Sequence, residues 1–383
     1  MSLLDTFKGK RILVTGHTGF KGAWLCEWLG MLGAKVVGVS LKHSPRTDPC
    51  FTSPNLFSEL GLKSRIHAHI ETDLRQPDGI LEAVRKHQPD VIFHLAAQPL
   101  VLRSYEDPRL TFETNVQGTL NVLEAVRITK LACVLVVVTT DKVYRNSDAV
   151  HAFRETDSLG GHDPYSASKA CVELMVAAYR DSFTRPGEAG SLLIAVARGG
   201  NVIGGGDWAD NRIVPDAVRA FSQGLPLTVR NPRATRPWQH VLELLGGYLR
   251  LAGLMVQASE AARTTGGEQK AAAIKKLHLL CSAYNFGPLI TANRPVGELV
   301  EEICKHWPGE MAIEKPPQAV REAGKLCLAV EKSFHYLGWT PRWSFEETVE
   351  KTISWYRQYY ESARGNCQQV RDLVDEQIRV FAP

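Results

Sequence analysis

Several features that would assign a protein to a class at first sight are missing from this chain of 383 residues. Its eight cysteines include no Cys-x-x-Cys pair, the usual spacing of zinc ligands and redox dithiols, so we expect neither a metal site nor disulfides. Cys26, Cys133 and Cys171 fall within apolar patterns, which predicts buried free thiols. The 45 basic and 41 acidic residues leave a net charge of only +4 without long runs of one sign, which argues against nucleic acid or a membrane surface as a partner.

Long apolar segments are missing as well. The N-terminus has no signal-peptide core and no apolar run approaches a membrane span, so we expect a cytoplasmic protein. Apolar residues still make up 44% of the chain, enough for a sizeable core, and the length suits one large α/β unit with a subsidiary lobe.

The sequence does contain a glycine-rich turn close to its start. Residues 12–14 form a short apolar run typical of a buried strand, and an apolar helical pattern covers 23–29. Between them, Gly16, Gly19 and Gly22 recur at every third position. Glycines in this context let the backbone approach a pyrophosphate and aim a helix N-terminus at its charge. The strand–turn–helix order favours dinucleotide binding over a simple tight turn.

Apolar runs and helical patterns alternate through the first half of the chain. Further strands are predicted at 35–41, 66–70, 89–98, 131–138 and 192–197, with helices at 80–87, 111–127 and 165–182. Such alternation predicts right-handed βαβ units and an α/β fold of the Rossmann type, with a doubly wound parallel sheet.

The regular alternation ends near residue 199. We assign residues 1–198 to the dinucleotide-binding domain, to which segments at about 237–258 and 281–292 return, and residues 199–383 mainly to a smaller α/β substrate lobe. Residues 259–276, rich in Ser, Thr, Gly, Gln, Ala and Lys, predict a mobile polar insertion that is partly helical.

The end of the second strand departs from the usual NAD-binding pattern. An acidic residue commonly binds the adenosine ribose there, but Ser40 takes its place. Lys42 or Arg46 would suit the 2′-phosphate of NADP, whereas Ser40 with His17 would suit the ribose of NAD, so these residues leave the choice open. Asp73, after the third strand, would either bind the adenine amino group or cap a helix.

A second group of polar residues follows the fifth strand. Tyr165 and Lys169 lie four residues apart in a helical pattern and therefore share one face. A nearby ammonium favours the phenolate and would lower the tyrosine pKa, while Thr140 offers a hydroxyl at the strand end. Together the three residues predict a hydride-transfer site.

Asp141 and Lys142 directly follow Thr140. A solvated turn would explain an Asp-Lys pair, but an acid and a base beside a redox site also suit the loss of water from an oxidised sugar. A 4-ketone acidifies the C5 hydrogen. Lys142 would take that proton if its pKa is depressed, and protonated Asp141 would donate to the leaving C6 hydroxyl.

The substrate lobe carries a basic segment suited to a pyrophosphate-bearing substrate. Arg230, Arg233 and Arg236 fall within seven residues, and the planar fork of arginine binds phosphate well. Asn201 would add a donor. Two tryptophans, Trp208 and Trp238, would either bracket a base or sugar or pack the lobe.

Four motifs place these residues in a known family. They are Gly-His-Thr-Gly-Phe-Lys-Gly at 16–22, Phe-His-Leu-Ala-Ala-Gln at 93–98, Asn-Val-Gln-Gly-Thr at 115–119 and Tyr-Ser-Ala-Ser-Lys at 165–169. The chain resembles the extended short-chain dehydrogenase/reductase superfamily over about residues 8–360. Within it, the segments 199–208, 236–243 and 337–343 are most similar to the nucleotide-sugar 4,6-dehydratases that act on CDP-glucose.

The resemblance implies an NAD-dependent lyase that converts CDP-D-glucose to CDP-4-keto-6-deoxy-D-glucose and water. Tyr165, supported by Lys169 and Thr140, would take the C4 hydroxyl proton while hydride leaves C4 for NAD, and the hydride would return to C6 after elimination across C5–C6. Lys142 matches the CDP-glucose type and is implied as the C5 base. NAD, held throughout the cycle, is implied although Ser40 replaces the acid.

The resemblance also implies binding residues and an assembly. The residues implied to contact NAD are Gly16, His17, Gly19, Phe20, Lys21, Gly22, Ser40, Asp73, Leu74, Leu95, Ala96, Ala97, Thr114, Thr139, Tyr165 and Lys169. Those implied to contact CDP-glucose or another nucleotide hexose are Gln98, Asn201, Trp208, Arg212, Arg230, Arg236 and His240. A homodimer, or a dimer of dimers, would use the helices at 111–127 and 165–182, and the product would enter deoxysugar biosynthesis for lipopolysaccharide O-antigen.

Two departures from the family concern substrate preference: Ala329 stands where the family has aspartate, and 259–276 is inserted. The alternatives are a dehydratase or 4-epimerase for another nucleotide sugar, and a nucleotide-sugar or dinucleotide sensor. An epimerase has no evident need of Asp141 and Lys142, and a sensor has no use for Thr140, Tyr165 and Lys169 together.

Overall fold

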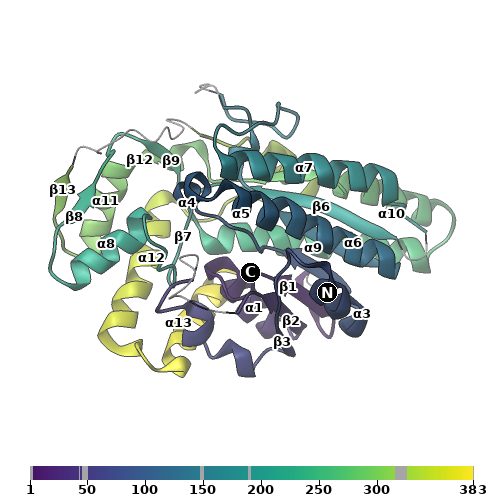
Figure 1. Ribbon diagram of the computed structural model, residues 1–383, viewed down its shortest axis with the longest axis horizontal. Coiled ribbons are helices and arrows are strands. Elements are labelled where there is room, and N and C mark those ends of the chain that lie inside the picture. Colours follow the sequence, from purple (N-terminus) through teal and green to yellow (C-terminus); the bar gives the residue numbers. More distant parts are fainter. Residues whose placement is uncertain are drawn as a thin grey trace.

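A seven-stranded parallel sheet forms the centre of the protein. The computed structural model describes residues 3–42, 44, 51–146, 151–188, 191–314 and 326–382. The strands follow the order β11-β6-β5-β4-β1-β2-β3, and every neighbouring pair is parallel, which confirms the predicted fold class (Figure 1). Their bounds are β1 Arg11–Thr15, β2 Lys35–Ser40, β3 Ala68–Glu71, β4 Val91–His94, β5 Cys133–Val138, β6 Leu192–Gly199 and β11 Ala283–Phe286.

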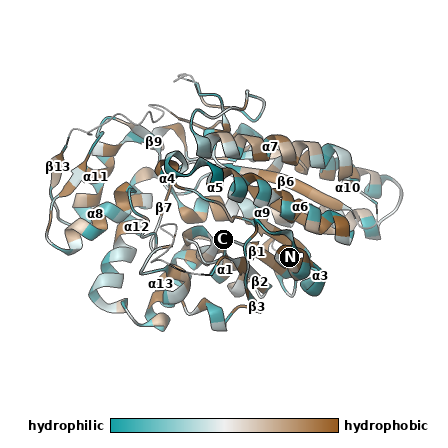
Figure 2. Cartoon of the chain, viewed as in Figure 1, coloured by the Kyte–Doolittle hydropathy of each residue, from teal (hydrophilic) through white to brown (hydrophobic). Residues whose placement is uncertain are grey.

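Alternate residues of the strands enter two separate cores. Leu13, Ile92 and Leu135 pack with helices α3, α6 and α7 on one face, whereas Val14 and Val136 pack with α1 and α9 on the other. Helices on both faces explain why β5 is buried at all six positions, and why β6 is brown in Figure 2. The bounds are α1 Phe20–Met31, α3 Pro77–His87, α6 Gly118–Thr129, α7 Pro164–Phe183 and α9 Val241–Thr264.

The expectation that no apolar segment approaches the length of a membrane span is wrong for helix α9. By length and composition alone this helix is apolar enough to cross a membrane, but 78% of its most apolar window is buried inside the protein. It packs against β5, β6 and β11. Its apolar surface is therefore part of the core beneath the sheet.

Residues 259–276, predicted to be partly helical, belong to two helices apart from Thr265 and Gly266. The last turns of α9 reach Thr264, and α10 (Gly267–Leu280) runs back along α9. Buried Ala273 and Leu277 join this helix to the core. The sequence did not predict the full extent of this helix, because only a narrow stripe of α10 is apolar.

The predicted helix at 111–127 contains a discontinuity. It is divided into α5 (Pro108–Phe112), a π-helical turn (Glu113–Gln117) and α6. One cysteine prediction is wrong: Cys26 and Cys133 are buried free thiols, but Cys171 is exposed because it lies on the outer face of α7.

A smaller lobe lies at one end of the molecule, on the left in Figure 1. Two-stranded pairs hold it together: β8 with β13, β9 with β12, and β7 with β10. The C-terminal helix α13 leaves this lobe and packs on α1, with Phe381 against Trp28. The remaining bounds are α2 Leu56–Glu59, α4 Val101–Glu106, β7 Val202–Ile203, α8 Ile213–Ser222, β8 Leu227–Val229, β9 Thr235–Pro237, β10 Gln239–His240, β12 Asn293–Pro295, α11 Val296–His306, β13 Met311–Ile313, α12 Phe345–Gln358 and α13 Cys367–Phe381.

Candidate active site

The glycine-rich turn joins the carboxyl end of β1 to α1. Gly16 has a φ of +72°, and a Cβ atom there would lie 2.8 Å from the backbone of Ala96. A Cβ atom on Gly22 would lie 2.2 Å from the Gly16 carbonyl oxygen, so the turn closes tightly on its own helix. The first turn of α1 contains no acidic residue and includes Lys21. Its free backbone N–H groups and this lysine fit an anionic pyrophosphate.

Strand β5 ends at the centre of the site. After its six buried apolar residues, the Thr140 side chain caps a short helical turn, Asp141–Val143, by accepting a hydrogen bond from Lys142 N. Thr140 Oγ1 also donates to Asp141 Oδ1 at 2.9 Å. Asp141 is 1% exposed, and Lys142 Nζ lies 4.0 Å from its Oδ1. The predicted acid and base are thus adjacent at the sheet edge.

Helix α7 presents Tyr165 and Lys169 to the same edge. Its start is fixed by Asp163, whose side chain accepts a hydrogen bond from Ser166 N, and by Pro164 in the first turn. Tyr165 lies close enough to Thr140 for the threonine hydroxyl to favour its phenolate, and Lys169 Nζ donates to the Val138 carbonyl. The structure therefore brings all five predicted catalytic residues together.

Burial controls the protonation of these two residues. It raises the pKa of Tyr165 to about 12, against the smaller lowering effect of the Thr140 hydrogen bond. The expectation of a lowered tyrosine pKa is thus wrong for the protein chain by itself. Burial, and then the charge of Lys21, lower the pKa of Lys169 to about 7.

Lys21 and Arg212 add positive charge from other elements. Burial lowers the pKa of Lys21 to about 8, with Arg212 acting in the same direction and Asp141 opposing it. Arg212 is the residue at the N-cap position of α8, and its side chain donates to Asp207 Oδ2 at 2.9 Å. Its charge lies near enough to Tyr165 to favour the phenolate. Asp207, buried in the glycine loop before α8, was not predicted from the sequence.

The loop after β4 is held by buried amides. Asn115 accepts from Gln98 N and donates to Ser168 Oγ, which ties this loop to α7. The Gln98 amide bonds to Leu100 and Thr111, so its side chain shapes its own loop, and its contact with substrate stays a prediction. Asn115 was the one polar residue in an apolar helical pattern, and that was the signal for its role.

The other residues predicted to bind the cofactor lie at this edge of the sheet or in the helices beside it. The sheet edge carries Leu95, Ala96 and Ala97, which follow β4, and Thr139, which donates to Glu173 at 2.6 Å. Phe20, in the first turn of α1, contacts the loop at Gly204, and Gly19 is the exposed N-cap of that helix. Thr114 lies in the π-helical turn, and Leu74 is buried.

The residues predicted to bind the adenosine half of the cofactor make contacts with their neighbours in the chain and in the sheet. Ser40 is buried at the end of β2 and donates to the Leu41 carbonyl. The His17 ring bonds His69 at 2.7 Å, and burial lowers the His17 pKa to about 4, so it is neutral. Asp73 accepts hydrogen bonds from Arg75 and does not cap α3, whose N-cap is Gln76. Arg46 lies outside the described residues.

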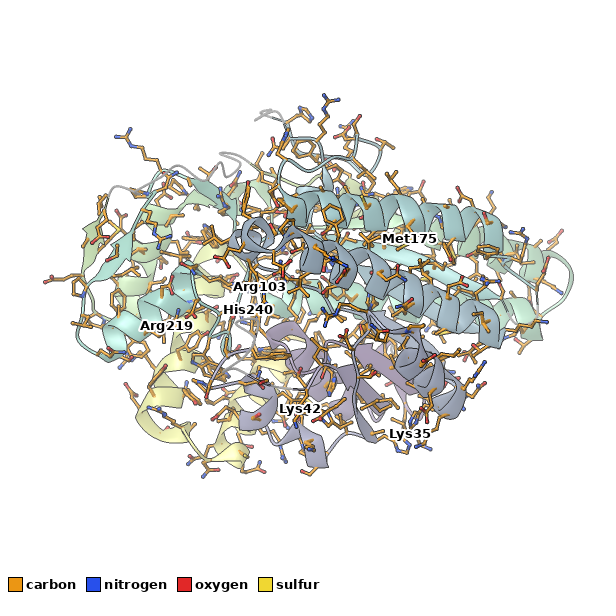
Figure 3. All side chains as sticks on the ribbon, in the orientation of Figure 1. Lys35, Lys42, Arg103, Met175, Arg219 and His240 are labelled. Carbon is orange, nitrogen blue, oxygen red and sulfur yellow. The ribbon has the colours of Figure 1, made fainter. Side chains whose placement is uncertain are left out.

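Two residues predicted to contact substrate are buried and make contacts within the protein. His240, labelled in Figure 3, is fully buried, and its ring accepts a hydrogen bond from Leu242 N to cap α9. Trp208 packs among Trp355, Tyr356 and Tyr359. Trp208 therefore packs the lobe, which was one of the two alternatives for it. Trp238 is also buried, and its indole N–H donates to the Arg294 carbonyl.

The remaining predicted contacts line the smaller lobe. Arg230 and Arg233 are exposed around β8 and β9, and Arg236 and Asn201 are half-buried. Gly200, beside Asn201, has room for no side chain, since a Cβ atom would lie 3.0 Å from Asp141 Oδ2. No group of His, Cys, Asp and Glu that would hold a metal occurs in the described part of the chain.

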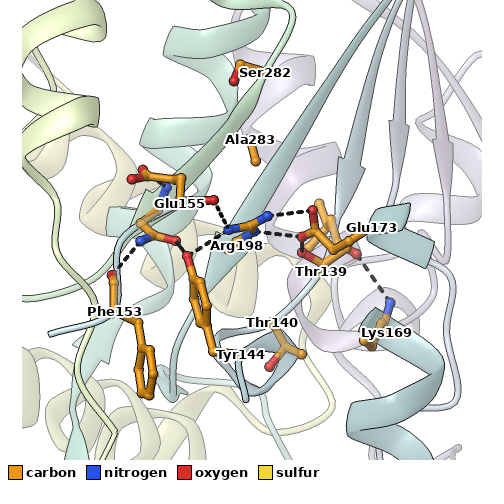
Figure 4. A network of polar contacts seen from close by, with 12 residues as sticks. Thr139, Thr140, Tyr144, Phe153, Glu155, Lys169, Glu173, Arg198, Ser282 and Ala283 are labelled. Carbon is orange, nitrogen blue, oxygen red and sulfur yellow. Dashed lines mark hydrogen bonds and ion pairs between the residues drawn. The ribbon is translucent and has the colours of Figure 1, made fainter. Parts of the chain in front are cut away.

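A buried polar network supports the site from behind (Figure 4). Glu173 accepts from Thr139 and from two nitrogens of Arg198, and Arg198 also donates to the Tyr144 hydroxyl. Tyr144 in turn donates to Asn285, whose amide binds the carbonyl of buried Ala329. The network links β5, α7, β6 and β11, and no pattern in the sequence indicated it.

Several known proteins are similar to this chain in sequence and in fold. The family model described as GDP-mannose 4,6 dehydratase matches residues 13–352. The CDP-glucose 4,6-dehydratase of Salmonella typhimurium is 38% identical over 354 residues, covering 92% of this chain and 91% of that protein. The UDP-glucose 4-epimerase of Thermus thermophilus, solved in complex with NAD, has 25% identity and a TM-score of 0.67, with 91% of this chain and 99% of that chain covered. The dTDP-glucose 4,6-dehydratase of Streptomyces venezuelae, solved with NAD, has 23% identity and a TM-score of 0.70, with coverages of 92% and 100%.

Proposed function

Because the chain belongs to the nucleotide-sugar 4,6-dehydratases matched by the GDP-mannose 4,6 dehydratase family model, we propose that it converts CDP-D-glucose to CDP-4-keto-6-deoxy-D-glucose and water. The observation that carries the proposal is the adjacency of two pairs of groups. Tyr165 and Lys169 suit oxidation of an alcohol, and Asp141 and Lys142 suit elimination. Thr140 is hydrogen-bonded to Asp141 and Lys142 N and lies close to Tyr165.

NAD is the cofactor of this proposal. The turn at 16–22 would hold its pyrophosphate, Lys169 its nicotinamide ribose, and Ser40 with His17 the adenosine ribose. Bound NAD⁺ supplies the acceptor for the C4 hydride and gives the hydride back at C6. Because the cofactor ends each cycle as it began, it need not leave.

The protein's own groups would move the protons. Tyr165, with its phenolate favoured by Arg212, takes the C4 hydroxyl proton. Lys142 takes the C5 proton, which the 4-ketone acidifies, and Asp141 donates to the departing C6 hydroxyl. When the hydride reaches C6, Lys142 returns a proton to C5, so the product keeps a hydrogen there. Asp141 is buried beside Thr140, whereas Lys142 is 30% exposed, so the acid is fixed and the base can reach the sugar.

We also propose a cytoplasmic homodimer that makes a deoxysugar precursor for lipopolysaccharide O-antigen. The apolar side chains left exposed along α5–α7 support the dimer: Phe112, Ile128, Leu174 and Phe183 are 37–62% exposed. The identity to the CDP-glucose enzyme supports the choice of nucleotide.

One experiment tests the reaction. The purified protein, without added cofactor, is incubated with CDP-, dTDP-, UDP- and GDP-hexoses deuterated at C4. We expect loss of water from CDP-glucose, with deuterium arriving at C6. A product of unchanged mass that is inverted at C4 would show that the protein is an epimerase and not a dehydratase. If no substrate changed, a nucleotide-sugar or dinucleotide sensor would be the remaining alternative.

A further inference from the structure

The ends of β2 and β3 present a row of side chains on one face of the sheet, beside the glycine-rich turn. Gly38 is in register with His69, and Ser40 with Glu71. Residues two apart on a strand point to the same face, and residues in register on neighbouring strands lie about 4.8 Å apart. Glu71 therefore lies next to Ser40, at the carboxyl edge where a dinucleotide places its adenosine ribose.

Glu71 is held by a short chain of hydrogen bonds. His69 Nε2 lies 3.3 Å from Glu71 Oε1, and His69 Nδ1 lies 2.7 Å from His17 Nε2. The His17 ring fills the space beside Gly38, where a Cβ atom would clash with it. A carboxylate can only accept, so the contact with Glu71 places a hydrogen on His69 Nε2. The rings thus fix one oxygen of Glu71, and the side chain, 40% exposed, presents the other to a ligand.

The neighbouring polar side chains are engaged within the protein. Ser40 donates its hydroxyl hydrogen to the Leu41 carbonyl and carries no charge. Asp73 binds Arg75 through both of its carboxylate oxygens, so its charge is balanced by the guanidinium. The Glu71 carboxylate, by contrast, is bound to an imidazole through a single oxygen. It is therefore the better placed of the two acids to accept hydrogen bonds from a ligand.

The two nicotinamide cofactors differ at the adenosine ribose. NAD carries a 2′-hydroxyl there, which donates a hydrogen bond, whereas NADP carries a 2′-phosphate, which is negative and accepts. A carboxylate binds the hydroxyl and repels the phosphate. Lys42, which follows Ser40 by two residues, would attract the phosphate (Figure 3). A preference for NAD therefore requires a negative charge close to the ribose.

We propose that Glu71 selects NAD over NADP by accepting hydrogen bonds from the adenosine ribose hydroxyls. Dinucleotide-binding folds commonly use an acid at the end of the second strand for this purpose, and this chain would use one on the third. Acids at both positions would place like charges side by side, so Ser40 and Glu71 fit together as one arrangement. This inference deepens the NAD site of the proposed function and rests on it.

Titration calorimetry of the protein freed of cofactor tests the proposal. For the wild type we expect NAD to bind at least tenfold more tightly than NADP. Glu71→Gln keeps the size of the side chain and removes its charge. We expect its NAD affinity to fall about 10–100-fold, the usual scale of hydrogen bonds to a charged group, and its NADP affinity to rise. Glu82→Gln removes an exposed carboxylate from α3 and should change neither affinity.

A cofactor without the 2′-hydroxyl tests the same contact from the ligand. We expect the wild type to bind 2′-deoxy-NAD about 10–100-fold more weakly than NAD. Glu71→Ala should bind the two within about threefold, because the partner of the hydroxyl is gone. A wild type that prefers NADP, equal losses of NAD and NADP affinity in Glu71→Gln, or undiminished discrimination against 2′-deoxy-NAD in Glu71→Ala would overturn the role of Glu71. A wild type that binds neither cofactor would contradict the proposed function instead.

Discussion

Arg198 and Glu173 form a buried two-point ion pair between β6 and α7. Arg198 Nε lies 2.8 Å and its Nη2 2.9 Å from the two carboxylate oxygens, and the side chains are only 4% and 3% exposed. Thr139 donates to the same carboxylate, one residue before Thr140. The pair therefore fixes the helix that carries Tyr165 and Lys169 against the strand end that carries Thr140.

Breaking this pair should destabilise the protein strongly. Arg198→Met leaves the Glu173 carboxylate buried without its partner, and we expect the free energy of unfolding to fall by about 3–5 kcal/mol. Chemical denaturation measures the change. Arg357→Met breaks the exposed Arg357–Glu361 pair and should change the denaturation midpoint little. Similar losses for both variants would mean that burial does not set the strength of the Arg198 pair.

The glycine-rich turn makes a second prediction about cofactor binding. Gly16→Ala places a Cβ atom 2.8 Å from the Ala96 backbone at a φ of +72°, so the turn must open. We expect cofactor affinity to fall at least tenfold by titration calorimetry, with a lower melting temperature. Gly30→Ala, in the same helix but away from the turn, is the matched variant, because no atom lies within 4 Å of its Cβ position and its φ is not positive. Equal effects of both changes would show that sterics at Gly16 are not the cause.

The sequence predicted the sheet and the side chains that meet at its edge because local patterns specify both. Apolar runs identify β5, and the spacing of Tyr165 and Lys169 identifies one face of α7. The buried network behind Thr139 could not be predicted, since Arg198 and Glu173 meet only after β6 and α7 pack together. The packing of His240 and Trp208 could not be predicted for the same reason: the sequence shows a residue type that can bind a ligand, and only the structure shows that the side chain is buried.

The buried lysine of α7 makes stability depend on pH. The pKa of Lys169 falls from 10.5 to about 7, chiefly because the side chain is buried. Between these values the unfolded chain binds a proton that the folded chain does not. Falling pH therefore costs the folded state about 1.4 kcal/mol per unit from about pH 10.5 down to about pH 7, and the full loss remains below pH 7.

Lys169→Met should remove this loss. We expect the variant to gain stability over the wild type as pH falls from about 10 to about 7, measured by urea denaturation without cofactor at several pH values. Lys35→Met, which removes a positive charge from the exposed start of β2, is the control for the change in net charge. A pH dependence identical in wild type and Lys169→Met would contradict the assignment.

Lys142 should be required for elimination and not for oxidation. Lys142→Met retains Thr140, Tyr165 and Lys169, so we expect the cofactor to be reduced and then to remain reduced, with turnover lowered about 10²–10⁴-fold. The check is single-turnover absorbance together with exchange of the C5 hydrogen in D₂O, which should be lost. A 6-fluoro leaving group should not restore the decay in this variant, because the C5 proton must still be removed. Full turnover would show that another group is the base.

The proposed dimer depends on the apolar side chains of α7. Leu174 is 62% and Phe183 44% exposed, on the face that also carries Ile128 of α6. Pairing two such faces would cover these side chains, whereas a charge placed among them would have to lose its water. Leu174→Asp should therefore shift the protein from dimer to monomer in size-exclusion chromatography with light scattering at micromolar concentration. Leu225→Asp changes an equally apolar side chain, 54% exposed but in the smaller lobe, and should leave the assembly unchanged. If Leu225→Asp alone dissociated the protein, the dimer would use the smaller lobe, and a monomeric wild type would remove the proposal altogether.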